Sequence, residues 1–241
     1  MVSTDKRNQP EQQAPPVQRL RIRYAKRGRL RFTSHRDFSR AFERALVRAR
    51  IPMAYSSGYN PHPRISYAGA SPTGAASEAE YLEIGLAETV EPARLAEELD
   101  RALPDGLDVL CVVEAAPGSL ADRLEASRWQ IDLPLPPDAV RAAAEAFLGR
   151  SSVTVERMTK KGLRSFDSRA AVLGLEVAAY EAGTRLTVLL RHAEPAVRPD
   201  DVLAGLRSAG GLEEGGAPLL TRLEQGPLDE SAGTIGDPLF D

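Results

Sequence analysis

The fold is decided by residues 19–50, which read RLRIRYAKRGRLRFTSHRDFSRAFERALVRAR. Within them, residues 19–25 alternate between basic and apolar side chains, the period of a half-buried β-strand. Ser34 is a candidate helix cap, and Asp37 three positions later completes a weak capping box. The apolar residues that follow recur at helical spacing, so we expect a helix from Ser34 to about Arg50. Its apolar side is formed by Phe38, Ala41, Phe42, Ala45, Leu46 and Ala49.

The pattern continues on both sides of this helix. Leu30 and Phe32 are expected to extend the sheet before it, and Pro52 ends it. Further along, the sequence predicts strands at residues 65–68 and 80–86, a helix from Pro92, and a strand at 107–113. The last of these is mostly apolar, which favours a central strand. The order strand, helix, strand, strand, helix, strand is that of a ferredoxin-like split βαβ domain.

The second half of the chain repeats this order with one extra strand. Strands are expected at 129–135, 153–158, 171–178, 185–190 and 219–223, with helices at 137–148 and 200–208. The sequence therefore predicts an α+β protein of two tandem ferredoxin-like domains, each an antiparallel sheet with its helices on one face. The expected divisions are a disordered arm at 1–18, a basic domain at 19–116, a linker at 117–127, the second domain at 128–224, and an acidic tail at 225–241.

Charge is distributed unevenly along the chain. Residues 19–64 hold thirteen lysines and arginines and two acidic residues, a net charge of +11. Residues 65–241 carry a net charge of −14, so the chain total of −3 conceals a strongly basic segment. Arg36, Arg40 and Arg44 recur every four residues along the polar side of the first helix. Such a row is typical either of a nucleic-acid contact or of an ordinary solvated helix face.

The segment 54–64, AYSSGYNPHPR, has a composition unlike its surroundings. Gly58, Pro61 and Pro63 argue against regular secondary structure. Its rigid aromatic and amide side chains beside an arginine-rich helix are typical of a surface that stacks bases and neutralises phosphates. The alternative is a long connection whose tyrosines only cover the edge of the core. The candidate contact residues here are Tyr55, Tyr59, Asn60, His62 and Arg64.

The sequence offers no convincing catalytic or metal site. Cys111 is the only cysteine, so neither an intrachain disulfide nor an all-cysteine metal site can form. The three histidines lack metal-ligand spacing, and no glycine-rich phosphate loop is present. His35, at the helix start, could act as a neutral general base, although a histidine bonded to solvent or to the cap is the simpler interpretation. We expect no cofactor. Because no signal peptide and no long apolar segment is present, we also expect a cytoplasmic protein without a membrane partner.

Several of these residues form a recognisable set of motifs. They are Lys26-x-Gly28, Phe32-x-Ser34-His35-x-Asp37, Phe42 to Leu46, Ile51 to Ser66 with its core from Tyr55, Pro72-x-Gly74, Glu80-Tyr81-Leu82, and Lys160-Lys161-Gly162 with Asp167-x-Arg169. Together the motifs resemble the radical-SAM-linked (radical-SAM-associated) protein family, a domain of unknown function, over about residues 19–223. The resemblance implies an accessory role beside a radical S-adenosylmethionine enzyme. That enzyme must be another polypeptide, since its iron–sulfur cluster needs three closely spaced cysteines.

We therefore expect an accessory protein that presents structured RNA, such as tRNA or rRNA, to a radical S-adenosylmethionine enzyme. One alternative is a protein-only adaptor that docks the enzyme through the basic face. Another is a metal-independent ribonuclease with His35 as general base, for which a fold-level similarity to CRISPR-repeat RNA endonucleases is weak support. The expected RNA contacts are Lys26, Arg29, Arg31, His35, Arg36, Arg40, Arg44, Tyr55, Tyr59, Asn60, His62 and Arg64.

Overall fold

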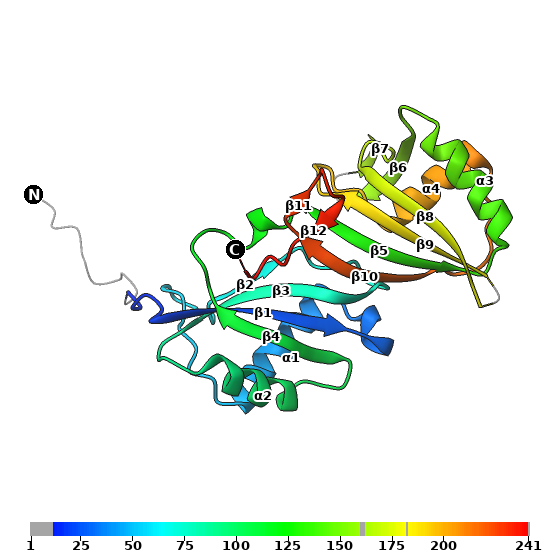
Figure 1. The fold of residues 1–241 in the computed structure, drawn as a ribbon. Coiled ribbons are helices and arrows are strands. Elements are labelled where there is room, and N and C mark those ends of the chain that lie inside the picture. Colours follow the sequence, from blue (N-terminus) through cyan, green and yellow to red (C-terminus); the bar gives the residue numbers. More distant parts are fainter. Residues whose placement is uncertain (1–11, 160–161, 182, 241) are drawn as a thin grey trace, which may run out of the picture. The chain divides into compact units, whose positions relative to one another are not determined.

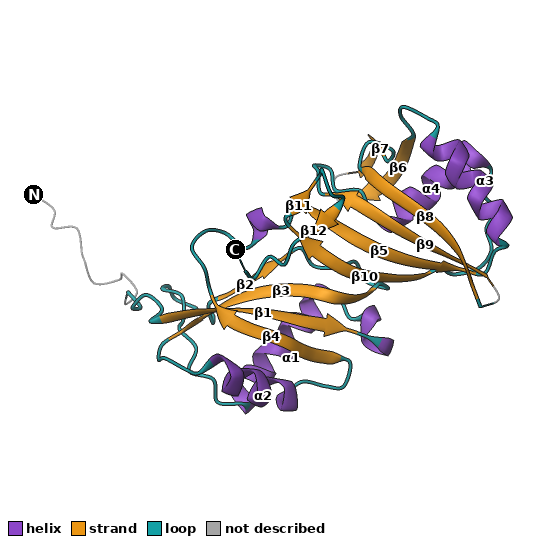
Figure 2. Cartoon of the chain, viewed as in Figure 1, coloured by secondary structure: helices purple, strands orange, loops and turns teal. Residues whose placement is uncertain are grey.

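A computed structural model describes residues 12–159, 162–181 and 183–240 of the chain (Figure 1). The chain forms two compact units, Met1–Ala70 with Glu80–Pro117 and Ser71–Ala79 with Gly118–Asp241. In each unit the helices cover one face of a mostly antiparallel sheet (Figure 2). The predicted fold class of two tandem ferredoxin-like domains is therefore confirmed. Lys160 and Lys161 of the sequence motif lie outside the described residues, as do residues 1–11 of the expected arm.

The first unit has the predicted order of elements. They are β1 (Gln18–Lys26), α1 (His35–Arg48), β2 (Ile65–Ala68), β3 (Ala76–Leu86), α2 (Pro92–Ala102) and β4 (Leu107–Glu114). The strands lie in the order β4-β1-β3-β2, which is the ferredoxin-like arrangement. β1 pairs antiparallel with β4, and β2 pairs antiparallel with β3. The residues of β3 up to Ala79 belong to the second unit.

Helix α1 packs on the sheet through the apolar residues predicted for it. Phe38, Phe42, Ala45 and Leu46 are buried, and Phe42 has no exposed surface. The ring of Phe38 stacks on Tyr24 of β1 with a centroid distance of 4.6 Å. The expected cap is also present, because Ser34 Oγ accepts a hydrogen bond from the backbone N–H of Asp37 at 3.2 Å. The register of α1, and hence the side that faces away from the sheet, is fixed by these contacts.

The second unit repeats the arrangement, with strand order β10-β5-β9-β8. Its main elements are β5 (Ala126–Leu133), α3 (Pro137–Leu148), β8 (Val172–Tyr180), β9 (Gly183–Arg191), α4 (Pro199–Gly210) and β10 (Leu219–Gly226). A parallel pairing of Thr221 with Ala76 and of Arg222 with Ser77 adds the start of β3 to β10. The core is built around Phe147 of α3, which is fully buried.

Two predictions for the second unit are wrong in detail. The extra strand is half of an inserted hairpin of β6 (Thr154–Thr159) and β7 (Gly162–Asp167), which pair with each other and not with the main sheet. The expected loose tail has structure as well. β10 continues to Gly226, β11 (Leu228–Asp229) pairs with β12 (Thr234–Ile235), and Leu239 is 3% exposed. Its acidic composition did not reveal the apolar residues that anchor it. The short 3₁₀ helix Ala121–Arg123 lies within the segment predicted as a linker.

Three predictions for the first unit are also corrected. Residues 28–32 form a 3₁₀ helix instead of extending the sheet, since Gly28 takes a φ of +54° and turns the chain. β4 stands at the end of the strand order and is not central; a bulge skips Leu110, which stays 40% exposed. Part of the expected disordered arm lies against the unit: Val17 N–H donates to Leu86 O at 2.8 Å, and Gln18 begins β1.

Candidate nucleic-acid interface

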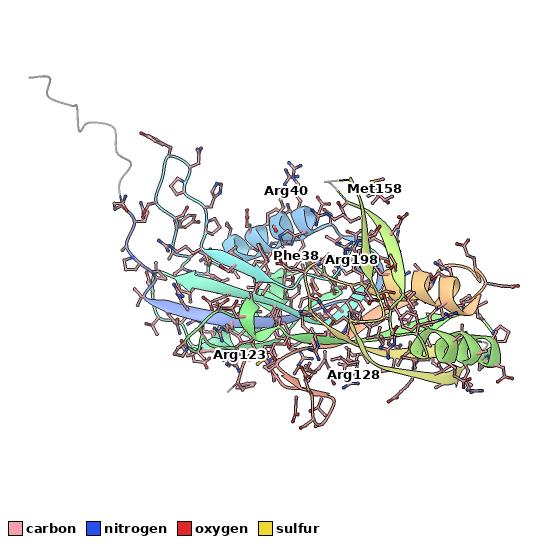
Figure 3. All side chains as sticks on the ribbon, turned by 90° about the horizontal axis from the view of Figure 1, so that it is seen from above. Phe38, Arg40, Arg123, Arg128, Met158 and Arg198 are labelled. Carbon is pink, nitrogen blue, oxygen red and sulfur yellow. The ribbon has the colours of Figure 1, made fainter. Side chains whose placement is uncertain are left out.

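The exposed side of α1 carries a row of arginines. Arg36, Arg40 and Arg44 are exposed, and none of them forms an ion pair within the described residues. Figure 3 shows Arg40 extending from α1 away from the ribbon. Arg48, the next residue of the row, donates its Nη1 to the carbonyl of Ala102 at 2.8 Å. The buried Phe38 side fixes the helix, so three guanidinium groups remain available on the opposite side.

This row is unfavourable for the isolated helix. Like charges four residues apart destabilise a helix by about 0.2–0.5 kcal/mol per pair. The other helix of the same unit shows the usual solution: on α2, Arg94 pairs with Glu98 at 2.9 Å and Arg101 with Glu97 at 3.7 Å. On α1, Arg36, Arg40 and Arg44 have no such pairing among the residues described. Val47, 73% exposed, lies in a shallow hollow of α1 that is lined by Arg40, Glu43, Arg44 and Arg48.

Residues 54–64 form a narrow paired segment, which we call the tongue. Tyr55 and Pro63 make an antiparallel bridge, and Ser56 N–H donates to His62 O at 2.8 Å. Arg64 N–H closes the base by donating to Ala54 O at 2.8 Å. The expectation that this segment has no regular structure is therefore wrong at its base. The prolines remove two donors but leave this ladder intact, because neither N–H that it uses belongs to a proline.

The tip of the tongue presents its aromatic and polar side chains to solvent. Tyr59 is 74% exposed, Tyr55 is 43% exposed, and Asn60 and His62 are also exposed. Arg64 is half-buried, and its Nε donates to Tyr55 O at 3.1 Å, so it also holds the tongue together. Because backbone pairing fixes the base, the exposed rings stand on a defined support. Such a support lowers the entropy lost when a base stacks on them.

His35 lies in the first turn of α1 and is exposed. Its ring meets the ring of Tyr67 edge to face at a centroid distance of 4.8 Å. Burial is the largest influence on Tyr67 and raises the pKa of its hydroxyl above 10.0. In the described part of the chain, neither ring nitrogen of His35 takes part in a hydrogen bond. A general base needs a partner that fixes its tautomer and orientation, and the structure gives His35 none among these residues.

Most of the predicted contact residues are exposed or half-buried on the first unit, with one correction. Lys26, at the end of β1, is 5% exposed and cannot reach a phosphate on the surface. Arg29 is exposed, and Arg31 is half-buried with its guanidinium 4.6 Å from the centroid of the Phe32 ring. Phe32 itself is 59% exposed, and we did not predict it as a contact. Gly28 in a basic segment was the signal for a turn that exposes this ring.

Neither a metal-binding cluster nor a membrane-spanning helix is present in the described part of the chain. Over residues 12–159, 162–181 and 183–240, no three His, Cys, Asp or Glu side chains are grouped so that they could hold a metal ion. In the same part of the chain, no helix combines the length and apolarity of a membrane span. Cys111 lies on β4 and is partly exposed.

Comparison with known proteins gives a family and, among solved structures, distant likenesses. Residues 19–199 match the family described as uncharacterized protein conserved in bacteria (DUF2344). No curated protein matches the chain. Among solved structures, a chain in the crystal structure of a Cbf5-Nop10-Gar1 complex is similar with a TM-score of 0.48 and 10% sequence identity. The alignment covers 92% of the present chain and 56% of that one, so the present chain spans little more than half of it.

Proposed function

The chain belongs to the family of uncharacterized proteins conserved in bacteria (DUF2344), and we propose that it is a non-catalytic accessory protein that binds structured RNA. In this proposal the RNA, such as tRNA or rRNA, is presented in the cytoplasm to a separate radical S-adenosylmethionine enzyme. The basic face of the first unit makes the contact. The observation that carries the proposal is the row of Arg36, Arg40 and Arg44, exposed and without ion pairs within the described residues.

Phosphates are the natural partners of such a row. A protein gains most of its RNA affinity from Lys and Arg that replace condensed counterions. The arginines recur every four residues on α1, so they follow the helix axis at about 6 Å intervals. This is close to the spacing of successive phosphates along an RNA strand. Arginine also matches a phosphate through two parallel N–H donors, which lysine cannot do.

The tongue supplies the second element of RNA recognition. Protein contacts to RNA with base selectivity are made mainly to unpaired nucleotides, which stack on aromatic side chains. Tyr59 and His62 are exposed on a segment with a fixed base, and Phe32 adds a third exposed ring beside Arg31. We assign phosphate binding to α1 and base stacking to the tongue.

The radical S-adenosylmethionine enzyme enters through the motif resemblance. With Cys111 as its single cysteine, this chain cannot itself hold a three-cysteine cluster. The proposal therefore gives the redox chemistry to the partner and substrate binding to this chain. A protein-only adaptor would use the same arginines against an acidic protein surface, and its affinity for RNA would be negligible. A ribonuclease would need His35 to be oriented as a base, for which the described residues provide no partner.

RNA binding by the purified chain is the direct test. Fluorescence anisotropy with a labelled tRNA measures the association constant. If roughly four to six phosphates are neutralised, the logarithm of this constant should fall with the logarithm of the salt concentration at a slope of about −3 to −5. The RNA should remain intact on a denaturing gel. Absent or salt-insensitive binding would refute the proposal and favour the adaptor, and cleavage lost in His35→Ala would favour the ribonuclease.

A further inference from the structure

A pocket lies at the base of the tongue, inside the first unit. Its volume is about 340 Å³, at the lower end of the range that holds small ligands. Four segments enclose it: Pro16 before β1, His62 at the tongue, Ser66 on β2, and Glu83 with Gly85 on β3. The N-terminal segment is tied to the tongue, since Gln13 N–H donates to Ser57 Oγ at 2.9 Å. The pocket is therefore a built feature of the unit and not a gap between mobile loops.

The one carboxylate in the pocket lining is held in a fixed orientation. Glu83 Oε1 lies 3.5 Å from Arg19 Nη1, and its Oε2 lies 3.2 Å from Nε of the fully buried Arg21. Its side chain is 17% exposed. Each oxygen of a carboxylate can accept two hydrogen bonds, so one position on each remains for a ligand. Glu83 therefore offers two adjacent acceptors to a ligand with two adjacent N–H donors.

The walls of the pocket suit a flat ligand. The rings of Pro16 and Pro63 and the imidazole of His62 line it. Gly85 contributes no side chain to the floor, and a Cβ there would lie 3.0 Å from Pro16 Cβ and 3.3 Å from Arg64 Cβ. A larger residue at this position would therefore fill the space or push the N-terminal segment away. The imidazole of His62 can stack on a nucleobase as aromatic side chains do in RNA recognition, and the two proline rings add apolar contact.

The charges at the rim favour a nucleotide over an uncharged ring. Arg19 has a side chain that is 62% exposed, and Arg64 uses its Nε on Tyr55 O while its two terminal nitrogens form no hydrogen bond within the described residues. Both arginines line the pocket, as does Glu83. A phosphate at the rim and two donors at the floor would thus both find partners.

We propose that this pocket receives one unpaired guanine of the bound RNA, an assignment that rests on the proposed function. Guanine carries an imino N–H and an amino group side by side on its Watson–Crick edge, which match the two free positions of Glu83. Adenine and cytosine each present an amino donor beside an acceptor, and uracil a single imino donor. Guanine is therefore the base that satisfies both acceptors without leaving one unpaired.

The test compares single-stranded oligonucleotides that differ at one atom group. Uridine dodecamers with a central guanosine, inosine or adenosine are titrated with the full chain by fluorescence anisotropy. Inosine lacks only the amino group of guanine, so the oligonucleotide with inosine should bind at least about tenfold more weakly than the one with guanosine. The oligonucleotide with adenosine should bind more weakly still. Equal affinities for the three would overturn the guanine pocket and leave the proposed function standing. Failure of all three to bind by a chain that binds tRNA would likewise overturn the pocket alone, and failure to bind tRNA as well would overturn both.

A pocket-filling variant locates the effect. Ser66 is exposed and stands directly opposite Glu83 in the β2–β3 pairing, so Ser66→Leu adds bulk beside the carboxylate while its two ion pairs remain. Guanosine and inosine should then bind equally. Ser165→Leu, on an exposed strand position in β7, is the matched control and should keep the preference. A guanosine preference that survives Ser66→Leu would place the reading site elsewhere and refute the pocket.

Discussion

The first unit and the second unit share one topology, but the arginines of α1 in the first unit differ in ion pairing from several arginines of the second unit. On α1 of the first unit, Arg36, Arg40 and Arg44 have no ion pairs within the described residues. In the second unit, several arginines are joined to carboxylates on helices and strands. These pairs are Arg128–Glu224 at 3.2 Å, Arg141–Asp138 at 2.9 Å, Arg185–Asp132 at 2.6 Å, Arg191–Glu230 at 2.9 Å, and Arg157–Asp201.

This difference distinguishes the buried residues that determine the fold from the exposed residues that are available for binding. Both units bury a phenylalanine on their first helix, Phe42 on α1 and Phe147 on α3, and both follow the same strand order. Those buried positions account for the shared topology. The exposed positions differ because they are not constrained by packing. We therefore assign equal structural roles to the two cores and a binding role to the α1 surface, the tongue and the pocket of the first unit.

The largest expected effect tests whether the two cores are equivalent. Phe42→Ala and Phe147→Ala each remove a fully buried ring, so each should lower the free energy of unfolding by roughly 3–5 kcal/mol. Urea denaturation followed by circular dichroism measures both. A loss below about 1 kcal/mol in either variant would show that the corresponding helix does not carry its core.

The next effect compares one tyrosine from each unit, the exposed Tyr59 and the partly exposed Tyr180. Tyr59→Ala should weaken RNA binding by roughly 1–3 kcal/mol, the value of one stacked base, and change the free energy of unfolding by within about 0.5 kcal/mol. Tyr180 of the second unit is the control, because its ring lies under the Arg185 guanidinium at 3.5 Å. Tyr180→Ala should leave RNA affinity unchanged. If Tyr59→Ala instead lowers the free energy of unfolding without changing the RNA affinity, the tongue has only a structural role.

Much of the fold was predictable from this sequence because the apolar residues that pack in the core recur with a clear helical or strand spacing. The spacing of Phe38, Phe42 and Leu46 predicted α1 within two residues. Lys26 shows the limit, since strand alternation cannot tell whether a strand end is covered by its surroundings. Leu110 shows another, because an apolar run predicts a central strand whether or not a bulge exposes one residue of it.

The candidate site was predictable in its residue types but not in its geometry. The arginine row and the tongue residues could be selected from charge and composition. Three facts needed the structure: within the described residues Arg36, Arg40 and Arg44 lack acidic partners, the tongue is paired at its base, and Phe32 is exposed. Each depends on residues distant in sequence. The pocket around Glu83 is of the same kind, since it joins Pro16, the tongue and β3.

A smaller effect distinguishes the second unit by its pH dependence. Burial is the main cause that lowers the pKa of His192 below 6.5, although the Leu124 carbonyl, 2.7 Å from its Nδ1, acts in the opposite direction. The unfolded chain then takes up the proton at higher pH than the folded chain. The contribution of the neutral His192 ring to the free energy of unfolding is therefore fully present above pH 6.5. It is lost as the pH falls through the pKa that His192 has in the folded chain. His192→Gln should flatten this decline in urea titrations at pH 7.5 and 5.5, and an unchanged decline would contradict it.

The smallest effect has opposite signs in the two units. Replacing Arg36, Arg40 and Arg44 together by Gln removes repulsion along α1 and should raise the free energy of unfolding by about 0.2–0.5 kcal/mol per like-charge pair. Replacing Arg128, Arg141 and Arg191 by Gln breaks three ion pairs and should lower it by about 0–1 kcal/mol each. Thermal melts at low salt compare the two. A stability loss in the α1 variant would mean that its arginines do have structural partners.

The central claim is that the α1 arginines neutralise RNA phosphates, and salt dependence tests it most directly. The measurement is tRNA affinity against salt for the wild-type chain and for these same two triple variants, which change the net charge equally. For the α1 variant we expect the slope of log affinity against log salt concentration to become less negative by about 2–3. The variant of the second unit should keep the wild-type slope. Equal slopes for the two variants would contradict it, because charge alone, and not the α1 surface, would then govern binding.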